Sequence, residues 1–566
     1  MISKLTAAVP KAAHAPLAAG LLAFALALPA FALLRSETAP DYAISKRQAA
    51  AIARSDARVR ESLGGRHVTA LRVTPLDDTE QRVSFFDGPR NVLDAAVSPR
   101  RVTHIADKPD GVPESGSVIA NSGLMLALLC AVFLLATLSV PLRSLHNLDA
   151  LALAAFVAPI ALLNANYVFA SVIASYPLLA YLALRCLGAG LVGGRQAAGS
   201  PLFCHLTRGW PAGQQRRLLR FAVLAAAAIV AMVVPSSTGA SDVAWASVAG
   251  ATDLLHGIAP YGHVPGFIFH GDTYPLLNYV LYVPGAALIP FEDAFSDPTG
   301  ALIVSGAAVL LAAFGLYRIG TRLSPTKEVE HEREDRKLAG MLVALAWLSF
   351  PPVILAASGG SNDALVAACL VLAFAFFFRP ALSAFLLGVA AWVKVLPLLA
   401  LPIWLARMSL RSALLALAGI AALSAAMTGW LLAIGGTGAV TGMLDGLTFQ
   451  LQRGSLHSLW LGLGVGALQP VAAAALLASI AAATLAVRRD RELRRDLRRM
   501  AALFAAVMLI AQIAANYWTW AYLPWATVPI LLSLLAPTAL VPSAVEERRQ
   551  VPVDHLVPGQ QANQPA

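Results

Sequence analysis

The sequence predicts an all-α polytopic membrane protein with a small α+β domain near its N-terminus. Of its 566 residues, 58% are hydrophobic and only 13% are charged, which is about half the charged share of a soluble domain. Uncharged runs long enough to cross roughly 30 Å of hydrocarbon recur along the chain; examples are 124–142, 221–241, 299–317 and 412–437. Basic residues gather in the short segments between such runs, as the positive-inside rule describes.

This charge pattern also sets the orientation. The first apolar run, 15–34, follows Lys4 and Lys11 and indicates an uncleaved membrane anchor over 1–35, with a cleaved signal peptide as the alternative. A cytoplasmic N-terminus places 36–117 outside and the basic loops inside. The formal net charge of +10 is then a topology signal, and no nucleic-acid partner is expected.

One stretch complicates the count of spans. Residues 274–290 are apolar enough to cross, but a span there would place the basic segment 318–337 outside. We therefore expect 274–290 to lie along the outer interface, where Tyr274, Tyr279 and Tyr282 would suit the headgroup boundary. With that assignment the basic loops fall inside, and about fourteen spans are expected.

The largest polar segment, 36–117, predicts the small domain. Residues 45–63 have helical spacing, and 67–75, 81–86 and 101–105 alternate as short strands. This succession resembles the PepSY type of extracytoplasmic module, which implies a regulatory or inhibitory cap. The alternative is a spacer that contacts the wall or packs on the membrane domain.

Two other regions complete the domain plan. Residues 118–214 are expected to form additional transmembrane helices and a cytoplasmic loop. The tail 541–566 is rich in Pro, Gln and charge, which predicts a disordered cytoplasmic segment. The four cysteines lack metal or disulfide spacing, so we expect them to be packing residues; they are Cys130, Cys186, Cys204 and Cys369.

The longest outer loop of the membrane domain starts at residue 236 and carries the candidate chemistry. Asp242 stands just after a span, and Tyr261 and Tyr274 follow further along. A carboxylate at the mouth of a membrane helix is partly desolvated, as a general base often is. Asp242 is therefore the candidate base, and Asp253 in the same loop is its rival.

Two outer segments contain residues suited to a phosphate. Lys394 lies in an apolar run at an outer helix end, where a lysine near the bilayer centre costs roughly 2.5–3.5 kcal/mol unless it reaches water or a partner. A lipid phosphate would be such a partner; snorkelling to the interface is the alternative. In the outer loop 448–460, Arg453 can hold two phosphate oxygens in its planar fork, and His457 can donate a proton to a departing phosphate.

The order of these elements resembles the GT-C superfamily of polyprenyl-phosphate-sugar-dependent glycosyltransferases. The nearest branch holds the actinobacterial polyprenol-phosphate-mannose-dependent α-mannosyltransferases. That family has an Asp in the first outer loop, then Leu-Leu-x-Gly-x-x-Pro-Tyr, then a juxtamembrane helix led by Tyr-Pro-Pro. Here the corresponding positions are Asp242, 254–261 and 274–276, with Leu276 in place of the second Pro.

A later part of the chain fits the same family. Residues 361–364 read Ser-Asn-Asp-Ala and open a helix, Arg379-Pro380 closes it, and 387–397 follow with Lys394. The resemblance covers about 215–535, so we expect a GT-C-like core over 215–540. It implies transfer of a sugar, with mannose expected, from a polyprenyl phosphate to a lipid, polysaccharide or protein acceptor on the extracytoplasmic side of the plasma membrane.

The resemblance also implies roles for particular residues. Asp242 would be catalytic. The donor phosphate would be bound by Lys394, Arg453 and His457. The substrate would be bound by Tyr261, Tyr274, Asn362 and Asp363.

Other classes of function and site leave weaker signals. The sequence shows no Gly-rich nucleotide loop, and the activated donor needs none, so no cofactor is expected. His256, His263 and His270 lack the helical spacing of a metal site, and no metal is expected. The alternative function is a transporter or flippase of cell-envelope precursors, although no repeated halves are visible. A sensor that uses 36–117 is a further alternative.

Overall fold

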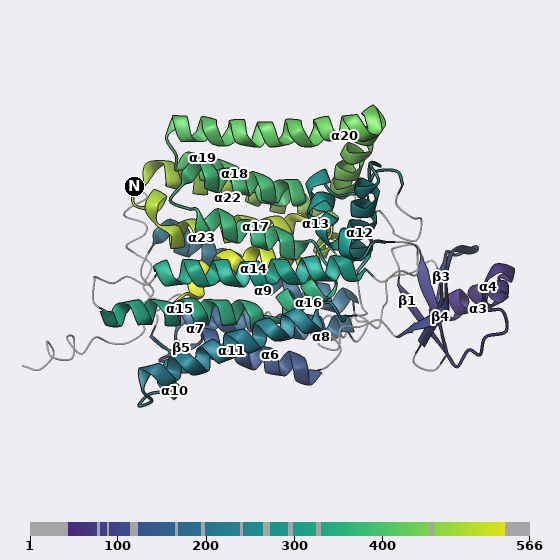
Figure 1. Ribbon diagram of the computed structural model, residues 1–566, viewed down its shortest axis with the longest axis horizontal. Coiled ribbons are helices and arrows are strands. Elements are labelled where there is room, and N and C mark those ends of the chain that lie inside the picture. Colours follow the sequence, from purple (N-terminus) through teal and green to yellow (C-terminus); the bar gives the residue numbers. More distant parts are fainter. Residues whose placement is uncertain are drawn as a thin grey trace, which may run out of the picture.

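A small α+β domain and a large helical bundle make up the part of the chain seen in a computed structural model (Figure 1). The structure describes residues 44–75, 80–87, 90–113, 123–164, 168–193, 199–237, 241–263, 272–291, 298–323, 330–452 and 458–537. The predicted N-terminal anchor and the predicted disordered tail lie outside these residues.

The small domain follows the predicted order of helix and then antiparallel sheet. Its elements are α3 (Lys46–Ser55), α4 (Ala57–Leu63), β1 (Ala70–Pro75), β2 (Gln81–Asp87), β3 (Arg90–Val97) and β4 (Val102–Pro113), with strand order β1-β2-β3-β4. The Ser45 and Gln48 side chains form a capping box that begins α3. Asp56 then ends α3 and caps α4, so one predicted helix is two. The strand β3 was not predicted.

The core of this domain explains why the two layers stay together. Ala49, Ala53 and Val59 on the helices are fully buried, as are Val83 and Leu93 on the strands. On β2, the predicted alternation places Val83 and Phe85 in this core.

The bundle is built from long apolar helices and many short ones. The first half contains α6 (Gly123–Thr137), β5 (Ser139–Val140), α7 (Leu145–Ala154), α8 (Val157–Asn164), α9 (Val168–Val192), β6 (Ser200–Pro201), α10 (Leu202–Leu206), α11 (Ala212–Val233), α12 (Asp242–Leu255), α13 (Leu276–Leu288) and α14 (Thr299–Leu323). The two strands β5 and β6 pair with each other.

The second half continues with longer and more broken elements. They are α15 (Glu330–Ser349), α16 (Pro351–Ser358), α17 (Asp363–Ala375), α18 (Pro380–Val393), η1 (Leu396–Ala400), α19 (Leu401–Ala406), α20 (Leu410–Gln452), α21 (Leu459–Gly462), η2 (Gly466–Leu468), α22 (Gln469–Arg489), η3 (Leu493–Arg495), α23 (Leu497–Ala514), η4 (Trp520–Tyr522), α24 (Leu523–Ile530) and η5 (Leu531–Leu535).

The expected fourteen spans are not confirmed. Within the described ranges, six helices are long and apolar enough to cross a membrane, or seven if the bent pair 335–349 and 351–358 is one span. Several apolar runs are instead interrupted by Pro or Gly and form helices of 10–17 residues. Several such helices near the candidate site, including α17 and α18, are only about 20 Å long, because each residue adds 1.5 Å.

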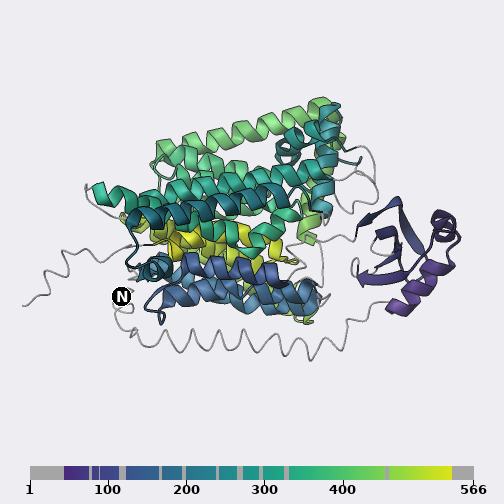
Figure 2. The ribbon, with the colours of Figure 1, turned by 60° about the horizontal axis from the view of Figure 1, so that its bottom comes forward.

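The basic segments meet at one end of the bundle. The Arg322 guanidinium at the end of α14 donates to the Ala375 carbonyl oxygen at the end of α17 (3.3 Å). Arg407 donates to the carbonyls of Phe377 (2.9 Å) and Arg494 (3.2 Å). This gathering agrees with the positive-inside pattern. Figures 1 and 2 show the small domain beyond the other end, where α12 lies.

The interfacial helix α13 is only partly as expected. Its 13 residues span about 20 Å, less than the hydrocarbon thickness, which favours the interpretation that it does not cross. Tyr279 and Tyr282, however, are fully buried. Their expected place at the headgroup boundary is wrong, because α13 packs between α12 and α14 and directs these rings into protein.

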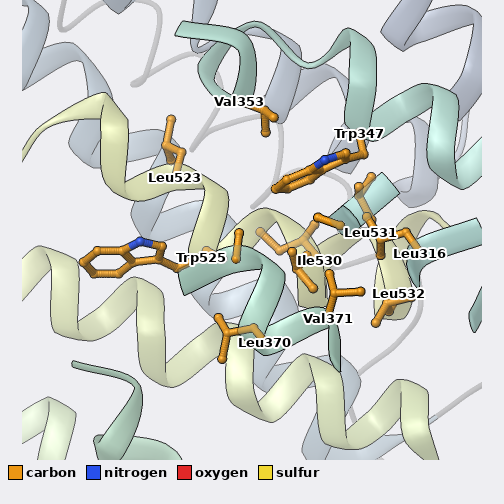
Figure 3. Packing of buried hydrophobic residues seen from close by; sticks show 14 of the residues in the cluster. Leu316, Trp347, Val353, Leu370, Val371, Leu523, Trp525, Ile530, Leu531 and Leu532 are labelled. Carbon is orange, nitrogen blue, oxygen red and sulfur yellow. The ribbon is translucent and has the colours of Figure 1, made fainter. Parts of the chain in front are cut away.

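Close helix contacts use small residues, as expected where lipid competes with protein for apolar surface. A Cβ added at Gly285 of α13 would lie 2.2 Å from the Gly300 carbonyl oxygen of α14, so this crossing requires glycine. At the centre of the bundle, Trp347 packs with Leu316 and Val371 and with residues of α24 and η5 (Figure 3). These contacts fix the positions of the helices that carry the site.

The long helix α20 runs along one edge of the bundle and then bends (Figure 1). The bend is at Gly436, which has a φ of 64°, a conformation that glycine adopts without strain. The part beyond the bend covers the outer loop: Ala439 and Met443 pack in one cluster with Tyr261 and Tyr279. The bend therefore closes one side of the candidate site.

Candidate functional site

A buried ion pair forms the centre of the site. The Lys394 ammonium lies 2.6 Å from Asp363 Oδ1, and the side chains are 15% and 1% exposed. The Ser361 hydroxyl donates to the other carboxylate oxygen, Oδ2. Both oxygens of Asp363 are therefore occupied, so this carboxylate is suited to holding Lys394 and less suited to accepting a proton.

The backbone around Asp363 explains why the pair forms here. A turn of two glycines joins α16 to α17, and Asp363 is the first residue of α17, where the helix dipole favours negative charge. Gly360 has a φ of 67°, and a Cβ on it would lie 2.5 Å from the Ala244 Cβ. Only glycine fits this turn against α12. Lys394 directly follows the last residue of α18, so the ends of two neighbouring helices supply the two charges.

Aromatic rings surround the Lys394 ammonium. Its Nζ lies 4.7 Å from the Tyr522 ring centroid, 5.0 Å from Trp525 and 5.7 Å from Tyr274. Tyr522 and Trp525 stack with centroids 4.7 Å apart. All three distances are within the range of a cation–π interaction. The site thus combines one cation with ring faces of the kind that stack on sugars.

Asp242 is held beside this turn but is not buried. It is the first residue of α12 and is exposed. The preceding Ser241 donates twice to the Gly359 carbonyl oxygen, through its backbone N–H and its hydroxyl, each at 2.8 Å. Asp242 is therefore fixed against the turn at Gly359 through its neighbour, while its own side chain is not covered by protein.

Electrostatics also relate Asp242 to the ion pair. Burial is the main cause that raises the pKa of Tyr274 well above 10, and the negative charges of Asp242 and then Asp363 act in the same direction. Tyr274 therefore lies in the field of both carboxylates. The structure thus brings Asp242, Tyr274, Asp363 and Lys394 to one locality.

Two other predicted substrate-binding residues, Asn362 and Tyr261, support the site through hydrogen bonds to neighbouring segments. The Asn362 amide donates to Asn278 Oδ1 (2.9 Å), and the Asn278 amide donates to Ser247 Oγ (3.2 Å). The buried Tyr261 hydroxyl donates to the Tyr274 carbonyl oxygen (2.8 Å). Tyr261 thus positions the turn that carries Tyr274, and its hydroxyl is already used.

Two buried polar atoms near the ion pair lack a protein partner. Within the described chain, Asn362 Oδ1 and Trp525 Nε1 form no hydrogen bond. Such atoms in a native protein are usually satisfied by water or by a bound molecule. Their residues flank Asp363 and contact Lys394, respectively, which identifies this locality as one able to take a polar ligand.

The other candidate base, Asp253, lies at the opposite end of α12 from Asp242. It lies near the end of α12, about 16 Å along the axis from Asp242 at 1.5 Å per residue. Burial raises the pKa of Asp253, and His263 and His256 oppose this shift. Across the residues that the structure describes, no three His, Cys, Asp or Glu side chains form a metal-binding group.

The structure does not test the remaining predicted residues. Arg453, His457 and His270 lie outside the described residues. Conversely, the sequence interpretation missed Tyr522, Trp525 and Asn278. The aromatic run 517–525 was the available signal for the first two. Trp518 in that run is 1% exposed and donates to Gln512, so it packs inside the protein.

Comparison with known protein families gives one result. Residues 273–512 match the family model of Glycosyltransferase family 87, a family of GT-C-type membrane glycosyltransferases. No curated protein and no solved structure shows a significant match. The matched segment contains Tyr274, Asn362, Asp363 and Lys394, whereas Asp242 precedes it. The match indicates a membrane glycosyltransferase, which implies a sugar donor, an acceptor and a lipid bilayer.

Proposed function

We propose that this protein transfers a hexose, with mannose as the expected sugar, from a polyprenyl phosphate to a hydroxyl acceptor on the extracytoplasmic side of the plasma membrane. The acceptor is a glycolipid, a polysaccharide or a protein. The observation that carries the proposal is the Lys394–Asp363 pair, ringed by Tyr274, Tyr522 and Trp525 and set beside Asp242.

The depth of the pair supports a lipid-linked donor. The helices α17 and α18 have 13 and 14 residues, or about 20 Å each, against roughly 30 Å of hydrocarbon. Both have one end at the basic end of the bundle. With that end at the inner boundary, their length leaves Asp363 and Lys394 about 10 Å short of the outer boundary. A phosphate on a polyprenyl chain can reach a charge at this depth from the bilayer while its chain stays in lipid.

The chemistry follows from these positions. The acceptor oxygen attacks the anomeric carbon of the donor sugar, and the bond between that carbon and the phosphate oxygen breaks, with both electrons going to the phosphate. Asp242 takes the proton of the acceptor hydroxyl. The products are the glycoside, the polyprenyl phosphate and a protonated Asp242, which returns its proton to water because its side chain is exposed.

The other residues position the reactants. Lys394 places a positive charge where the phosphate leaves, and Asp363 and the three rings keep that charge in place. Such preorganised charge acts strongly where water is excluded. The Asn362 amide oxygen accepts a hydroxyl of the sugar. Arg453 and His457 are proposed to complete the phosphate site, and the domain at 36–117 to act as a PepSY-like regulatory cap.

The test is incubation of purified protein with radiolabelled polyprenyl-phosphate mannose and a membrane lipid extract. A labelled product that is absent with Asp242→Asn and present with Asp253→Asn supports the proposal. The two carboxylates are at opposite ends of one helix, so Asp253→Asn controls for damage to α12. The alternative outcome is that none of several polyprenyl-phosphate hexoses gives a product and that the protein moves labelled lipid across vesicle membranes. That outcome would identify the protein as a lipid flippase and contradict the proposed transfer.

A further inference from the structure

A groove at the basic end of the bundle lies between α14 and α17, far from the Lys394–Asp363 pair. Its cavity volume is about 360 Å³, at the lower end of the range of roughly 300–1,000 Å³ for small-molecule sites. Its surface is almost wholly apolar and includes Phe314 and Phe378, and its lining also contains Arg318, Arg322 and Arg379.

Along α14, the residues that line the groove pass from apolar to cationic. Leu311, Phe314, Arg318 and Arg322 lie on one face of α14, because their spacing of three or four residues matches the helical repeat. Phe314 is 60% exposed and Leu311 is 46% exposed. The two guanidiniums lie closer to the end of α14, beside the exposed Arg379. This order matches a molecule with an anionic head and an apolar chain.

Two of the three arginines are available for such a head. Among the described residues, the side chains of Arg318 and Arg379 form no hydrogen bond or ion pair. A second hollow, of about 260 Å³, shares Arg318 and Arg322 with the first and extends to Arg336 and Lys337 on α15. The basic surface is therefore continuous between α14 and α15.

The membrane context selects the class of ligand. Basic loops mark the cytoplasmic side, and the cytoplasmic leaflet is the one that presents anionic headgroups to basic pockets between helices. Guanidinium groups bind phosphate oxygens in a planar, two-pronged geometry. A soluble anion would leave the exposed Phe314 and Phe378 unused, whereas an acyl chain covers them.

We propose that this groove binds an anionic glycerophospholipid of the inner leaflet, with its phosphate on Arg318, Arg322 and Arg379 and an acyl chain along Leu311, Phe314 and Phe378. The site is separate from the proposed transfer reaction and does not depend on it. The bound lipid fills the groove between α14 and α17. The helix α17 also carries Asp363, at its other end.

The test compares lipid retention by native mass spectrometry of the full-length protein in mild detergent. The protein is titrated with an equal mixture of phosphatidylglycerol and phosphatidylcholine. The test variant is Arg318→Gln/Arg379→Gln, which spares Arg322 because its guanidinium holds the Ala375 carbonyl. The matched control is Arg489→Gln/Arg491→Gln, which removes two exposed charges at the same end.

Wild type and control are expected to retain phosphatidylglycerol in preference to phosphatidylcholine. The test variant should bind it about 25-fold more weakly, from roughly fivefold per guanidinium. If the test and control variants lost the same amount of lipid affinity, the effect would come from general surface charge, and the proposed site would be wrong. Phe314→Asn should weaken lipid retention with the arginines intact. If inorganic phosphate displaced the lipid while Phe314→Asn had no effect, the groove would be a site for a soluble anion and the proposal would fail.

Discussion

Replacing Lys394 with Met removes the charge of the buried pair and keeps most of the apolar stem. Asp363 is 1% exposed and would be left as an uncompensated buried carboxylate. Breaking a buried pair in this way costs about 3–5 kcal/mol of stability. Because Lys394 is itself only 15% exposed, solvent screening does little to reduce this figure. We expect Lys394→Met to unfold at a clearly lower temperature than wild type.

The pair of substitutions Lys394→Met/Asp363→Asn separates structure from function. Asn at position 363 removes the negative charge but still accepts the Ser361 hydroxyl bond. We therefore expect the double variant to regain most of the lost stability, since neither charge remains buried alone. If Lys394 also binds the donor phosphate, the apparent affinity for the lipid donor stays low in the double variant.

The assay measures thermal unfolding in detergent and the KM for the lipid donor on the same preparations of wild type, both single variants and the double variant. Recovery of stability together with normal donor KM in the double variant would assign Lys394 a purely structural role. An unchanged unfolding temperature in Lys394→Met would refute the energetic argument itself, because it would mean that Asp363 needs no partner.

The other predictions concern the base, the turn and the topology. Asp242→Asn should lower kcat about a hundred- to ten-thousand-fold with the donor KM little changed. Asp253→Asn should lower kcat only a few-fold. If a steady-state assay gave the reverse order, Asp253 would be the general base. Gly360→Ala should lower the unfolding temperature, because φ is 67° and the added Cβ would lie 2.5 Å from a side-chain carbon of α12, a strain of about 1–3 kcal/mol; an unchanged melting curve would count against the geometry of the turn. Asp272→Cys and Glu292→Cys should both react with an impermeant thiol reagent added outside, and protection of position 292 alone would make α13 a span and move the basic segment 318–337 outside.

Much of the architecture follows from local composition. Long uncharged runs and basic loops predict a helical membrane protein, and alternation after a helix predicts the small sheet. Both signals are local, because the length of an apolar run and the period of a strand depend only on neighbouring residues. The number of spans was harder to predict from the sequence. Pro and Gly divide apolar runs into helices of 10–17 residues, and composition alone does not distinguish these from spans.

The candidate site shows the same division. Asp363 at a helix start and Lys394 at a helix end were recognisable in the sequence, but each was assigned its own role. Only the packing of α17 against α18 brings their charges to 2.6 Å, and only the return of the chain at η4 and α24 adds Tyr522 and Trp525. Ion pairs and ring contacts depend on distances between segments far apart in the chain, and helix packing sets those distances. The sequence by itself therefore determined that this is a helical membrane protein with charged residues at helix ends, and the tertiary structure decided which of those charges meet.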